Sequence, residues 1–231
     1  LDISVASADF LSSGHGFRVF GYPGSEAGRS VASAGDINGD GYDDLIIGAP
    51  GRGRFDEFVH TIFQDVGEAL VLFGKAEVFA DVLTQYAHIL GGFSGDYTGW
   101  SVSSAGDINA DGFDDVIIGA LIAGVGSQPG AAFIVYGKAA GLTFIDLGSE
   151  GLVSSGQGFV IAGDASTRFM GSSTAPAGDV NGDGIDDLVV GNLDGDKAVV
   201  VFGSTSPHAD INLSVDNLPL SGRGFRVFGV D

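Results

Sequence analysis

The chain has 231 residues, and 44% of them are apolar, so it can bury a sizeable core and is not a disordered acidic tail. Thirty Asp and Glu against 10 Lys and Arg give a formal charge of -20, which argues against nucleic acid and anionic membrane surfaces as partners, because both attract basic patches. The chain has no Cys for disulfides or thiolate metal sites, and no apolar run long enough to span a membrane, so we expect no membrane insertion.

The beginning of the chain resembles its end. The run SSGHGFRVFG, which ends at Gly21, matches LSGRGFRVFG, which ends at Gly229. Further upstream, DIS from Asp2 matches DIN from Asp210 at the same offset of 208 residues. We therefore expect residues 1–21 to supply the last strand of a preceding repeat.

Three repeats of about 70 residues follow, which we place at residues 22–92, 93–163 and 164–231. Each contains one version of the same segment: SVASAGDINGDGYDDLIIGAP from Ser30, SVSSAGDINADGFDDVIIGAL from Ser101, and SSTAPAGDVNGDGIDDLVVGNL from Ser172. The first Asp of this segment falls at 36, 107 and 179, in steps of 71 and 72 residues. A fixed period of this kind predicts repeated structural units.

Each repeat contains four short runs that are typical of strands. The run before the Asp-rich segment is small and rich in Ser and Ala, which suits close packing near a crowded axis. The run after it, such as DDLIIGA, is continuously apolar and reads as a strand buried on both faces. Two more runs follow, the first ending in an aromatic residue and Gly and the second closed by Gly: ALVLFG and AHILG, AAFIVYG and GFVIAG, AVVVFG and GFRVFG.

Four-stranded units at a fixed period, with no long helical pattern between them, predict an all-β, propeller-like fold of antiparallel blades. The chain supplies three complete repeats and one extra N-terminal strand. Propellers close with about four to eight blades. The prediction is therefore a partial propeller, an arrangement assembled from copies, or an open stack of blades.

The Asp-rich segments share the spacing D-x-N-x-D-G-x-x-D, which places oxygen ligands at alternate positions and a Gly where the chain bends. Calcium prefers six to eight such hard oxygens. In the first loop we expect as ligands the side chains of Asp36, Asn38, Asp40 and Asp44 and the carbonyl oxygen of Tyr42. In the second we expect Asp107, Asn109, Asp111 and Asp115 with the carbonyl of Phe113. In the third we expect Asp179, Asn181, Asp183 and Asp187 with the carbonyl of Ile185.

Two other interpretations of these loops are less favoured by the sequence. Asp/Gly loops often simply join strands, but three loops at one register match the needs of calcium each time. An EF-hand is disfavoured because no Glu follows at the twelfth position and the flanks are strand-like. The Asp before each final ligand, at 43, 114 and 186, points elsewhere by alternation and is not an expected ligand. The prediction is about three calcium ions, one per repeat.

The segment AGDINGDGYDDLIIGAP from Ala34, together with the pairs Phe73-Gly74 and Phe202-Gly203, resembles the FG-GAP or integrin α-type propeller repeats over essentially the whole chain. The chain departs from this pattern at Gly119 and Gly191, where Gly-Ala-Leu and Gly-Asn-Leu replace Gly-Ala-Pro, and at Tyr136. The resemblance implies calcium loops between the first and second strand of each blade, on one face, with partners docking on the opposite face. It also implies a secreted or cell-surface protein similar to bacterial adhesins.

The sequence predicts a protein without catalytic activity, because its four His sit at unrelated repeat positions and no GxSxG segment is present. The leading hypothesis is a module for adhesion or for recognition of a protein or glycan ligand. The alternatives are a structural unit that pairs with other copies through its open ends, and an auxiliary domain of a secreted hydrolase. A long loop from residue 50 to 67 carries the candidate ligand-binding residues Arg52, Arg54, Phe55 and Phe58.

Overall fold

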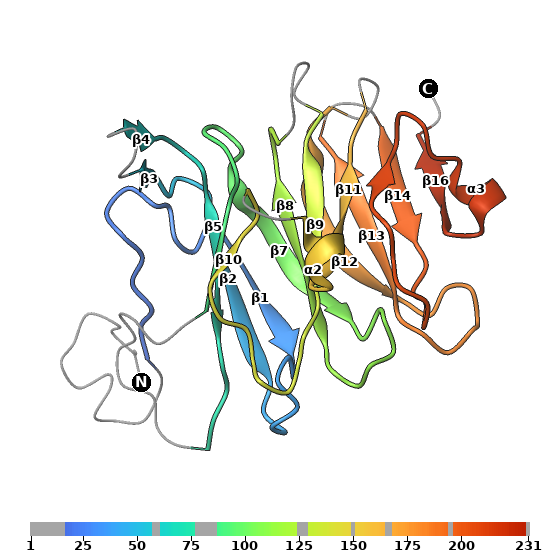
Figure 1. The fold of residues 1–231 in the computed structure, drawn as a ribbon, viewed down its shortest axis with the longest axis horizontal. Coiled ribbons are helices and arrows are strands. Elements are labelled where there is room, and N and C mark those ends of the chain that lie inside the picture. Colours follow the sequence, from blue (N-terminus) through green and yellow to red (C-terminus); the bar gives the residue numbers. More distant parts are fainter. Residues whose placement is uncertain are drawn as a thin grey trace, which may run out of the picture.

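The computed structural model describes residues 17–56, 61–76, 87–123, 129–148, 151–164, 168–193 and 196–229, with the backbone alone at 54–56 and 61–63. The predicted all-β, propeller-like architecture is confirmed: three sheets stand side by side and do not close into a ring (Figure 1). Most of the segment expected to hold an extra N-terminal strand, residues 1–16, lies outside this description. In the described part of the chain, no helix is long and apolar enough to cross a membrane.

Each sheet contains four antiparallel strands in the order in which they follow along the chain, and we call these groups blades 1, 2 and 3. Blade 1 contains β1 (Ser30–Gly35), β2 (Asp44–Ala49), β5 (Glu68–Leu72) and β6 (Ala87–Leu90). Blade 2 contains β7 (Thr98–Gly106), β8 (Asp115–Ala120), β9 (Ala131–Val135) and β11 (Gly158–Ala162). Blade 3 contains β12 (Met170–Gly178), β13 (Asp187–Asn192), β14 (Lys197–Val201) and β16 (Gly224–Phe228). A separate hairpin of β3 (Arg54–Asp56) and β4 (Thr61–Phe63) leaves blade 1.

The continuously apolar run of each repeat forms the second strand of its blade. All six residues of β8 are buried, because blade 2 has a neighbour on both faces. One apolar cluster joins blades 1 and 2 around Ile37 and Val116, and another joins blades 2 and 3 around Ile108 and Leu188. The core of this molecule therefore lies between the blades.

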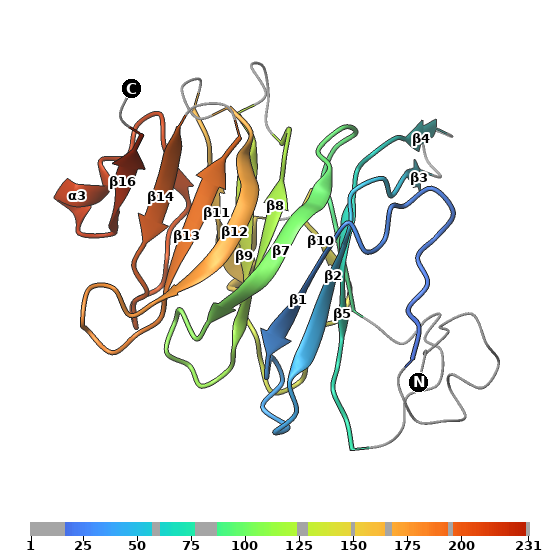
Figure 2. The same ribbon diagram turned by 180° about the vertical axis from the view of Figure 1, so that it is seen from behind.

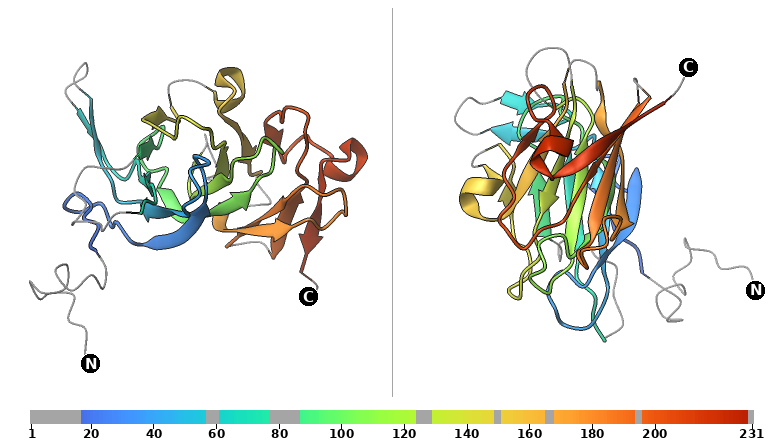
Figure 3. Two further views of the ribbon diagram at one scale, coloured as in Figure 1. Left: turned by 90° about the horizontal axis from the view of Figure 1, so that it is seen from below. Right: turned by 90° about the vertical axis from the view of Figure 1, so that its right-hand side faces the viewer.

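The first strands, β1, β7 and β12, lie next to one another along one side of the stack (Figure 3, left). Small residues are required on these strands and at Gly48 of β2 and Gly119 of β8, which face the first strand of the next blade. A Cβ atom on Gly48 would lie 2.0 Å from the carbonyl oxygen of Gly99, and one on Gly119 would lie 1.9 Å from that of Gly171. The Ser30 and Ser101 hydroxyls donate to the same two carbonyls, at 3.1 and 2.9 Å. The Ser, Ala and Gly content of these strands thus permits the close approach of neighbouring blades.

Two short strands that the sequence did not reveal lock each blade to the one before it. The strand β10 (Ile145–Asp146) belongs to the second repeat but pairs in parallel with β6 of blade 1. The strand β15 (Ile211–Asn212) belongs to the third repeat and pairs in parallel with β11 of blade 2. Each is followed by a single helical turn, α2 (Leu152–Ser155) or α3 (Leu218–Ser221).

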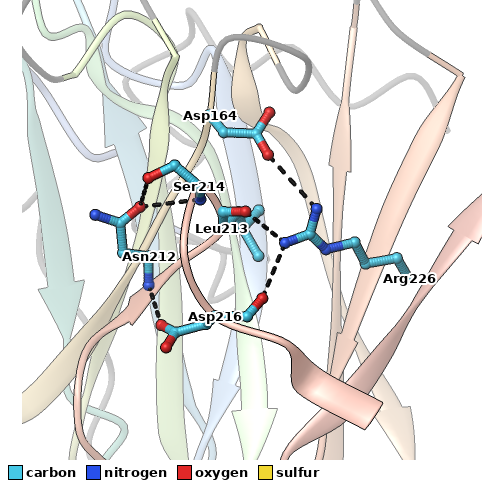
Figure 4. A network of polar contacts seen from close by, with 6 residues as sticks. All are labelled: Asp164, Asn212, Leu213, Ser214, Asp216 and Arg226. Atoms are coloured by element: carbon cyan, nitrogen blue, oxygen red, sulfur yellow. Dashed lines mark hydrogen bonds and ion pairs between the residues drawn. The ribbon is translucent and has the colours of Figure 1, made fainter. Parts of the chain in front are cut away.

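Arg226 on β16 fixes the chain that follows β15 (Figure 4). Its guanidinium donates to the carbonyl oxygens of Leu213 and Asp216, the second at 3.2 Å, and lies 3.5 Å from the carboxylate of Asp164. The Asp216 carboxylate in turn accepts the Asn212 amide hydrogen at 2.6 Å. One side chain of blade 3 therefore holds the turn and the adjoining segment of blade 2 together.

Candidate metal centres

The three Asp-rich loops connect the first and second strand of each blade, and all three lie at the same end of the stack (Figure 2). Each loop begins after a β-bulge at the end of the first strand, as at Ser104 to Gly106 in blade 2. The bulge and the strand pairing place the Gly before the first Asp opposite the last Asp of the loop, for example Gly106 opposite Asp115. The predicted donors of one loop are therefore brought together at one turn.

The first Asp of each loop folds back over the turn. In the second loop, the two carboxylate oxygens of Asp107 accept the backbone amide hydrogens of Asp111 and Gly112, both at 2.9 Å. The first loop repeats this with Asp36, and the third with Asp179, at 2.8 to 3.0 Å. Since the same bonds recur three times, the side-chain geometry follows from the repeated spacing.

The middle donors form a second repeated arrangement. The Asn109 side-chain oxygen accepts the Asp111 amide hydrogen at 2.9 Å, and the Asn109 side-chain nitrogen donates to the Asp111 carboxylate at 2.9 Å. The other oxygen of that carboxylate accepts from the Phe113 amide at 3.0 Å. The equivalent bonds occur in the first and third loops.

The last Asp of each loop is fully buried and ties the loop to the third strand of its blade. The carboxylate of Asp115 accepts amide hydrogens from Ile108 at 3.1 Å and from Gly137 at 2.9 Å. Asp44 accepts the equivalent pair of hydrogen bonds from Ile37 and Gly74. Asp187 accepts them from Val180 and Gly203. This residue has a structural role whether or not it also binds a metal.

Burial makes a negative charge at the last position costly. It raises the pKa of Asp115 to about 8, and the nearby carboxylates of Asp111 and Asp107 raise it as well, against the hydrogen bonds from Gly137 and Ile108. Burial likewise raises the pKa of Asp44. A cation near these carboxylates would favour their ionised forms.

The donor set of each loop suits calcium in kind: three carboxylates, one side-chain amide oxygen and one backbone carbonyl, all hard oxygens. These five groups reach six to eight oxygens where carboxylates bind through both of their oxygens. In the conformation of the structure these carboxylates are turned toward loop amides, and no group of three acidic or His side chains among the described residues converges on one point. Each carboxylate oxygen has about two acceptor sites, and one amide uses only one of them. Carboxylate oxygens that accept a single hydrogen bond within the loop, such as those of Asp107, therefore keep one acceptor site each.

In the second and third loops, the Asp that precedes the last donor contacts the neighbouring blade. The carboxylate of Asp114 accepts the Asp36 amide hydrogen at 2.8 Å, and that of Asp186 accepts the Asp107 amide hydrogen at 3.2 Å. The role of these carboxylates in joining blades was not visible in the sequence, because the spacing shows only which way a side chain points.

The candidate ligand-binding residues of the long loop do not form one described site. The Arg52 guanidinium lies 3.9 Å from the centre of the Tyr22 ring, and its Nε atom lies 3.5 Å from the buried carboxylate of Glu68. This guanidinium is therefore engaged inside the protein. Arg54 and Phe55 lie on β3, where the structure gives the backbone alone, and Phe58 lies outside the described residues.

Sequence reasoning missed a cavity of about 440 Å³ between blades 2 and 3, next to the second Asp loop. Its lining includes Tyr136 and His208, whose hydroxyl and Nδ1 atoms lie 3.0 Å apart. The His208 ring is stacked on Phe159 with centroids 4.5 Å apart. Tyr136, where the other repeats have Phe, was visible in the sequence as a departure from the repeat pattern. Its partner His208 could not be found in this way, because it lies 72 residues further along the chain.

The fold and the loops together define a class: an all-β repeat protein of propeller blades with an Asp-rich loop at the same corner of each blade. The family model described as "FG-GAP repeat" matches residues 27–68, 98–135 and 170–212. The chain belongs to the FG-GAP repeat family, in its integrin alpha type.

Curated relatives cover most of the chain. Integrin alpha-5 of Xenopus laevis is 35% identical over 191 residues, which make up 81% of this chain and 17% of the relative. Integrin alpha pat-2 of Caenorhabditis briggsae is 31% identical over 216 residues, or 87% of this chain and 17% of the relative. A phosphatidylinositol-glycan-specific phospholipase D of Bos taurus is 30% identical over 179 residues, or 74% of this chain and 19% of the relative. The chain thus spans less than a fifth of the length of these proteins.

Proposed function

We propose that the chain is a non-catalytic module for adhesion or ligand recognition whose three loops each bind one calcium ion for structural reasons. The observation that carries this proposal is the repetition of one donor set with one hydrogen-bond pattern at the same corner of three adjacent blades. Loops that only reverse the chain would not need the same donor set three times, because a single Asx or Gly residue suffices to form a turn.

The ions would be held by the same five donors in each loop. In the second loop these are the side chains of Asp107, Asn109, Asp111 and Asp115 and the carbonyl oxygen of Phe113. When bound, the divalent cation offsets much of the repulsion among the three carboxylates. The backbone amides that donate hydrogen bonds to Asp107 and Asp115 hold the loop in its turn, so less backbone freedom is lost on binding.

Calcium would act on more than its own loop. The Asp114 carboxylate holds the start of the first loop, and Asp186 holds the start of the second. A rigid loop in one blade therefore supports the adjacent blade. We infer that calcium stiffens the joints between blades and so presents a fixed surface for a partner.

The recognition role is supported by the integrin alpha relatives, and it includes an extracellular location, either secreted or at the cell surface. The ligand would be a protein or a glycan that contacts the end of the stack opposite the Asp loops, where the hairpin of β3 and β4 projects (Figure 1). Long loops on rigid scaffolds often carry binding residues. The proposed contacts are therefore Arg54 and Phe55 on that hairpin.

Calcium dependence is tested by thermal unfolding with calcium and with a chelator. Calcium at about 100 times its Kd adds about 2.7 kcal/mol of stability for each site. Asp111→Asn keeps an acceptor but removes a charge, so it should reduce the calcium-dependent shift, whereas Glu26→Gln, at an exposed acid outside the loops, should leave it unchanged. An equal shift in all three proteins would contradict calcium binding at the loops.

Recognition is tested by screening the calcium-loaded chain against glycan and extracellular-protein arrays, beside the double variant Arg54→Ala/Phe55→Ala. Binding that requires calcium and is lost in the double variant supports the proposal. Binding that persists in the variant would place the ligand site elsewhere, and no binding in either protein would oppose a recognition role.

A second candidate function is that of an auxiliary domain of a secreted hydrolase. One observation favours it: a relative that matches 74% of this chain is named as a phospholipase D. Hydrolysis of a phosphatidylinositol-glycan substrate by the isolated chain would contradict the absence of catalysis. Binding of that substrate without turnover would support the auxiliary role.

A further inference from the structure

The three Asp loops differ at the residue that follows their Asn. This residue is Gly in the first and third loops, at Asn38-Gly39 and Asn181-Gly182, but Ala in the second, at Asn109-Ala110. Asn is among the thermally labile residues, and its side-chain carbonyl carbon lies close along the chain to the next backbone nitrogen. A Cβ atom on the next residue crowds that nitrogen, whereas Gly leaves it open to close approach. The loops therefore contain two open Asn-Gly steps and one hindered step of the same design.

Two hydrogen bonds to Asp40 hold the Asn38 side chain folded back over the Gly39 peptide unit. The Asn38 Oδ1 atom accepts the Asp40 amide hydrogen at 2.9 Å, and the Asn38 Nδ2 atom donates to the Asp40 carboxylate at 3.0 Å. The bond to Oδ1 polarises the side-chain carbonyl, which favours attack of a nucleophile on Cγ. A held orientation also removes part of the entropic barrier to such an attack. The Asn38 amide is therefore oriented and activated next to the Gly39 nitrogen.

The peptide unit of Gly39 is less restrained than its counterparts in the other loops. The Gly182 amide donates to the Asp179 carboxylate at 2.7 Å, so its nitrogen has less freedom to turn toward the Asn181 side chain. The Ala110 amide donates to a backbone carbonyl oxygen at 3.4 Å and carries a Cβ atom beside the nitrogen. The Gly39 amide donates no hydrogen bond to any described residue, and Gly39 is exposed to water. Of the three steps, the first is the most open to reaction.

We propose that Asn38 is a site of spontaneous deamidation, with water as the co-reactant. The Gly39 nitrogen bonds to Cγ of Asn38 while its hydrogen passes to the side-chain nitrogen, the Cγ–Nδ2 bond breaks, and ammonia leaves a five-membered imide. Water then adds to either carbonyl carbon of the imide and opens the ring. One product is aspartate, and the other is isoaspartate, in which the main chain runs through the side-chain carbons. The reaction transfers no electrons, so it needs neither oxidant nor reductant.

The modification alters the metal centre of the first loop, an effect that rests on the proposed calcium site. Conversion of Asn38 to aspartate adds a fourth carboxylate to those of Asp36, Asp40 and Asp44, which increases their repulsion in the absence of metal. Isoaspartate lengthens the main chain between two donors and so changes their spacing. Calcium that binds the Asn38 oxygen should in turn restrain the side chain and slow the attack. The first loop should therefore be modified chiefly during the time that it spends without metal.

Peptide mapping by mass spectrometry tests the proposal on the folded, metal-free chain, kept at physiological temperature and pH. We expect the peptide that contains Asn38 to show the exchange of ammonia for water, as separate aspartyl and isoaspartyl products, while Asn109 keeps its amide. A Cβ atom on Gly39 would lie 2.6 Å from the Phe113 ring, so the variants are placed in the other two loops.

The two variants exchange the open and hindered steps. Ala110→Gly should make Asn109 reactive, and Gly182→Ala, where an added Cβ atom meets nothing within 4 Å, should protect Asn181. Neither variant should change the rate at Asn38. The chain unfolded in urea is the control for sequence alone: Asn38 and Asn181 should react equally there, because they lie in the nearly identical runs INGDG and VNGDG.

The outcomes separate this proposal from the proposed calcium site. Faster conversion of Asn38 than of Asn181 and Asn109 in the folded chain supports the proposal. An Asn38 that stays intact, or that reacts no faster than these two, would overturn it. Calcium added to the folded chain should slow the reaction at Asn38. An unchanged rate would count against calcium binding in the first loop, while Asn38 would remain the modified residue.

Discussion

At the scale of the residue, Ala110 occupies a loop position that Gly39 and Gly182 occupy in the other two loops. All three have left-handed backbone angles, with φ of +57° at Ala110, +72° at Gly39 and +79° at Gly182. Only Gly adopts this conformation without a steric cost. The second loop therefore carries local backbone strain that the other two lack.

Ala110→Gly should raise the free energy of unfolding by about 1 kcal/mol, because it removes the clash of the Cβ atom with the backbone. The matched control is Gly182→Ala. An added Cβ atom there meets nothing within 4 Å, so this variant measures only the cost of the left-handed backbone conformation. It should lower the free energy of unfolding by a similar amount. Urea unfolding of both variants measures the effect, and a loss of stability in Ala110→Gly would contradict it.

His208 contacts Tyr136 between blades 2 and 3. The equivalent positions between blades 1 and 2 hold the apolar residues Leu142 and Phe73. Its Nδ1 atom faces the Tyr136 hydroxyl at 3.0 Å, and its Nε2 atom faces the carbonyl oxygen of Phe202 at 3.3 Å. A neutral ring that carries its hydrogen on Nε2 satisfies both contacts. Burial lowers the pKa of His208, and the charge of Arg223 lowers it further, against the hydrogen bond to Phe202.

The lowered pKa of His208 predicts a loss of stability in mild acid. The unfolded chain takes up a proton near the ordinary His pKa of about 6.5, before the folded chain does, so the free energy of unfolding falls as pH drops below that value. The slope is at most about 1.4 kcal/mol per pH unit. The double variant His208→Leu/Tyr136→Phe copies the apolar pair of the preceding blades and should lose less stability between pH 7 and 5. Equal losses, measured by urea unfolding, would contradict this role.

At the scale of the element, β15 is held by Arg226 in addition to its own hydrogen bonds. The strand is two residues long, and the Leu213 amide continues its pairing by donating to the carbonyl oxygen of Ala162 at 3.0 Å. Arg226→Leu would leave the carbonyl oxygens of Leu213 and Asp216 without this donor. We expect a loss of about 2 kcal/mol, as for charge-assisted hydrogen bonds.

The effect of Arg226→Leu should be local. Hydrogen exchange at the Leu213 amide should accelerate, while exchange in β8, at the centre of blade 2, should change little. Uniform acceleration along the chain would instead indicate that Arg226 supports the whole fold rather than β15.

The sequence predicted the long strands and missed the short ones for a physical reason. A run such as DVIIGA in β8 is readable because all six of its residues are buried. The strands β10 and β15 have two residues each, too few to show a period, and both pair with a strand of another repeat. The one-turn helices α2 and α3 were missed for the same reason of length.

For the loops, spacing alone predicted the metal donors, because that prediction depends only on residue type and order. Spacing could not show that Asp115 reaches Gly137, 22 residues away, or that Asp114 reaches Asp36, 78 residues away. Such contacts depend on how blades stack, which is a property of the assembled repeats.

At the scale of the whole molecule, the formal charge of -20 is concentrated in part at one end of the stack, where all three Asp loops lie (Figure 2). Carboxylates held this close repel one another and weaken the compact state. Divalent cations at this end would remove the repulsion in all three blades. The loops and the joints between blades should therefore respond to calcium together.

Isothermal titration of the metal-free chain with calcium tests this account most directly. The account predicts about three sites per chain, reduced to about two in the variant Asp107→Ala/Asp111→Ala, because each loop holds one ion. Absence of binding, or a stoichiometry unaffected by that variant, would show that the loops are hydrogen-bonded turns and would contradict the central claim.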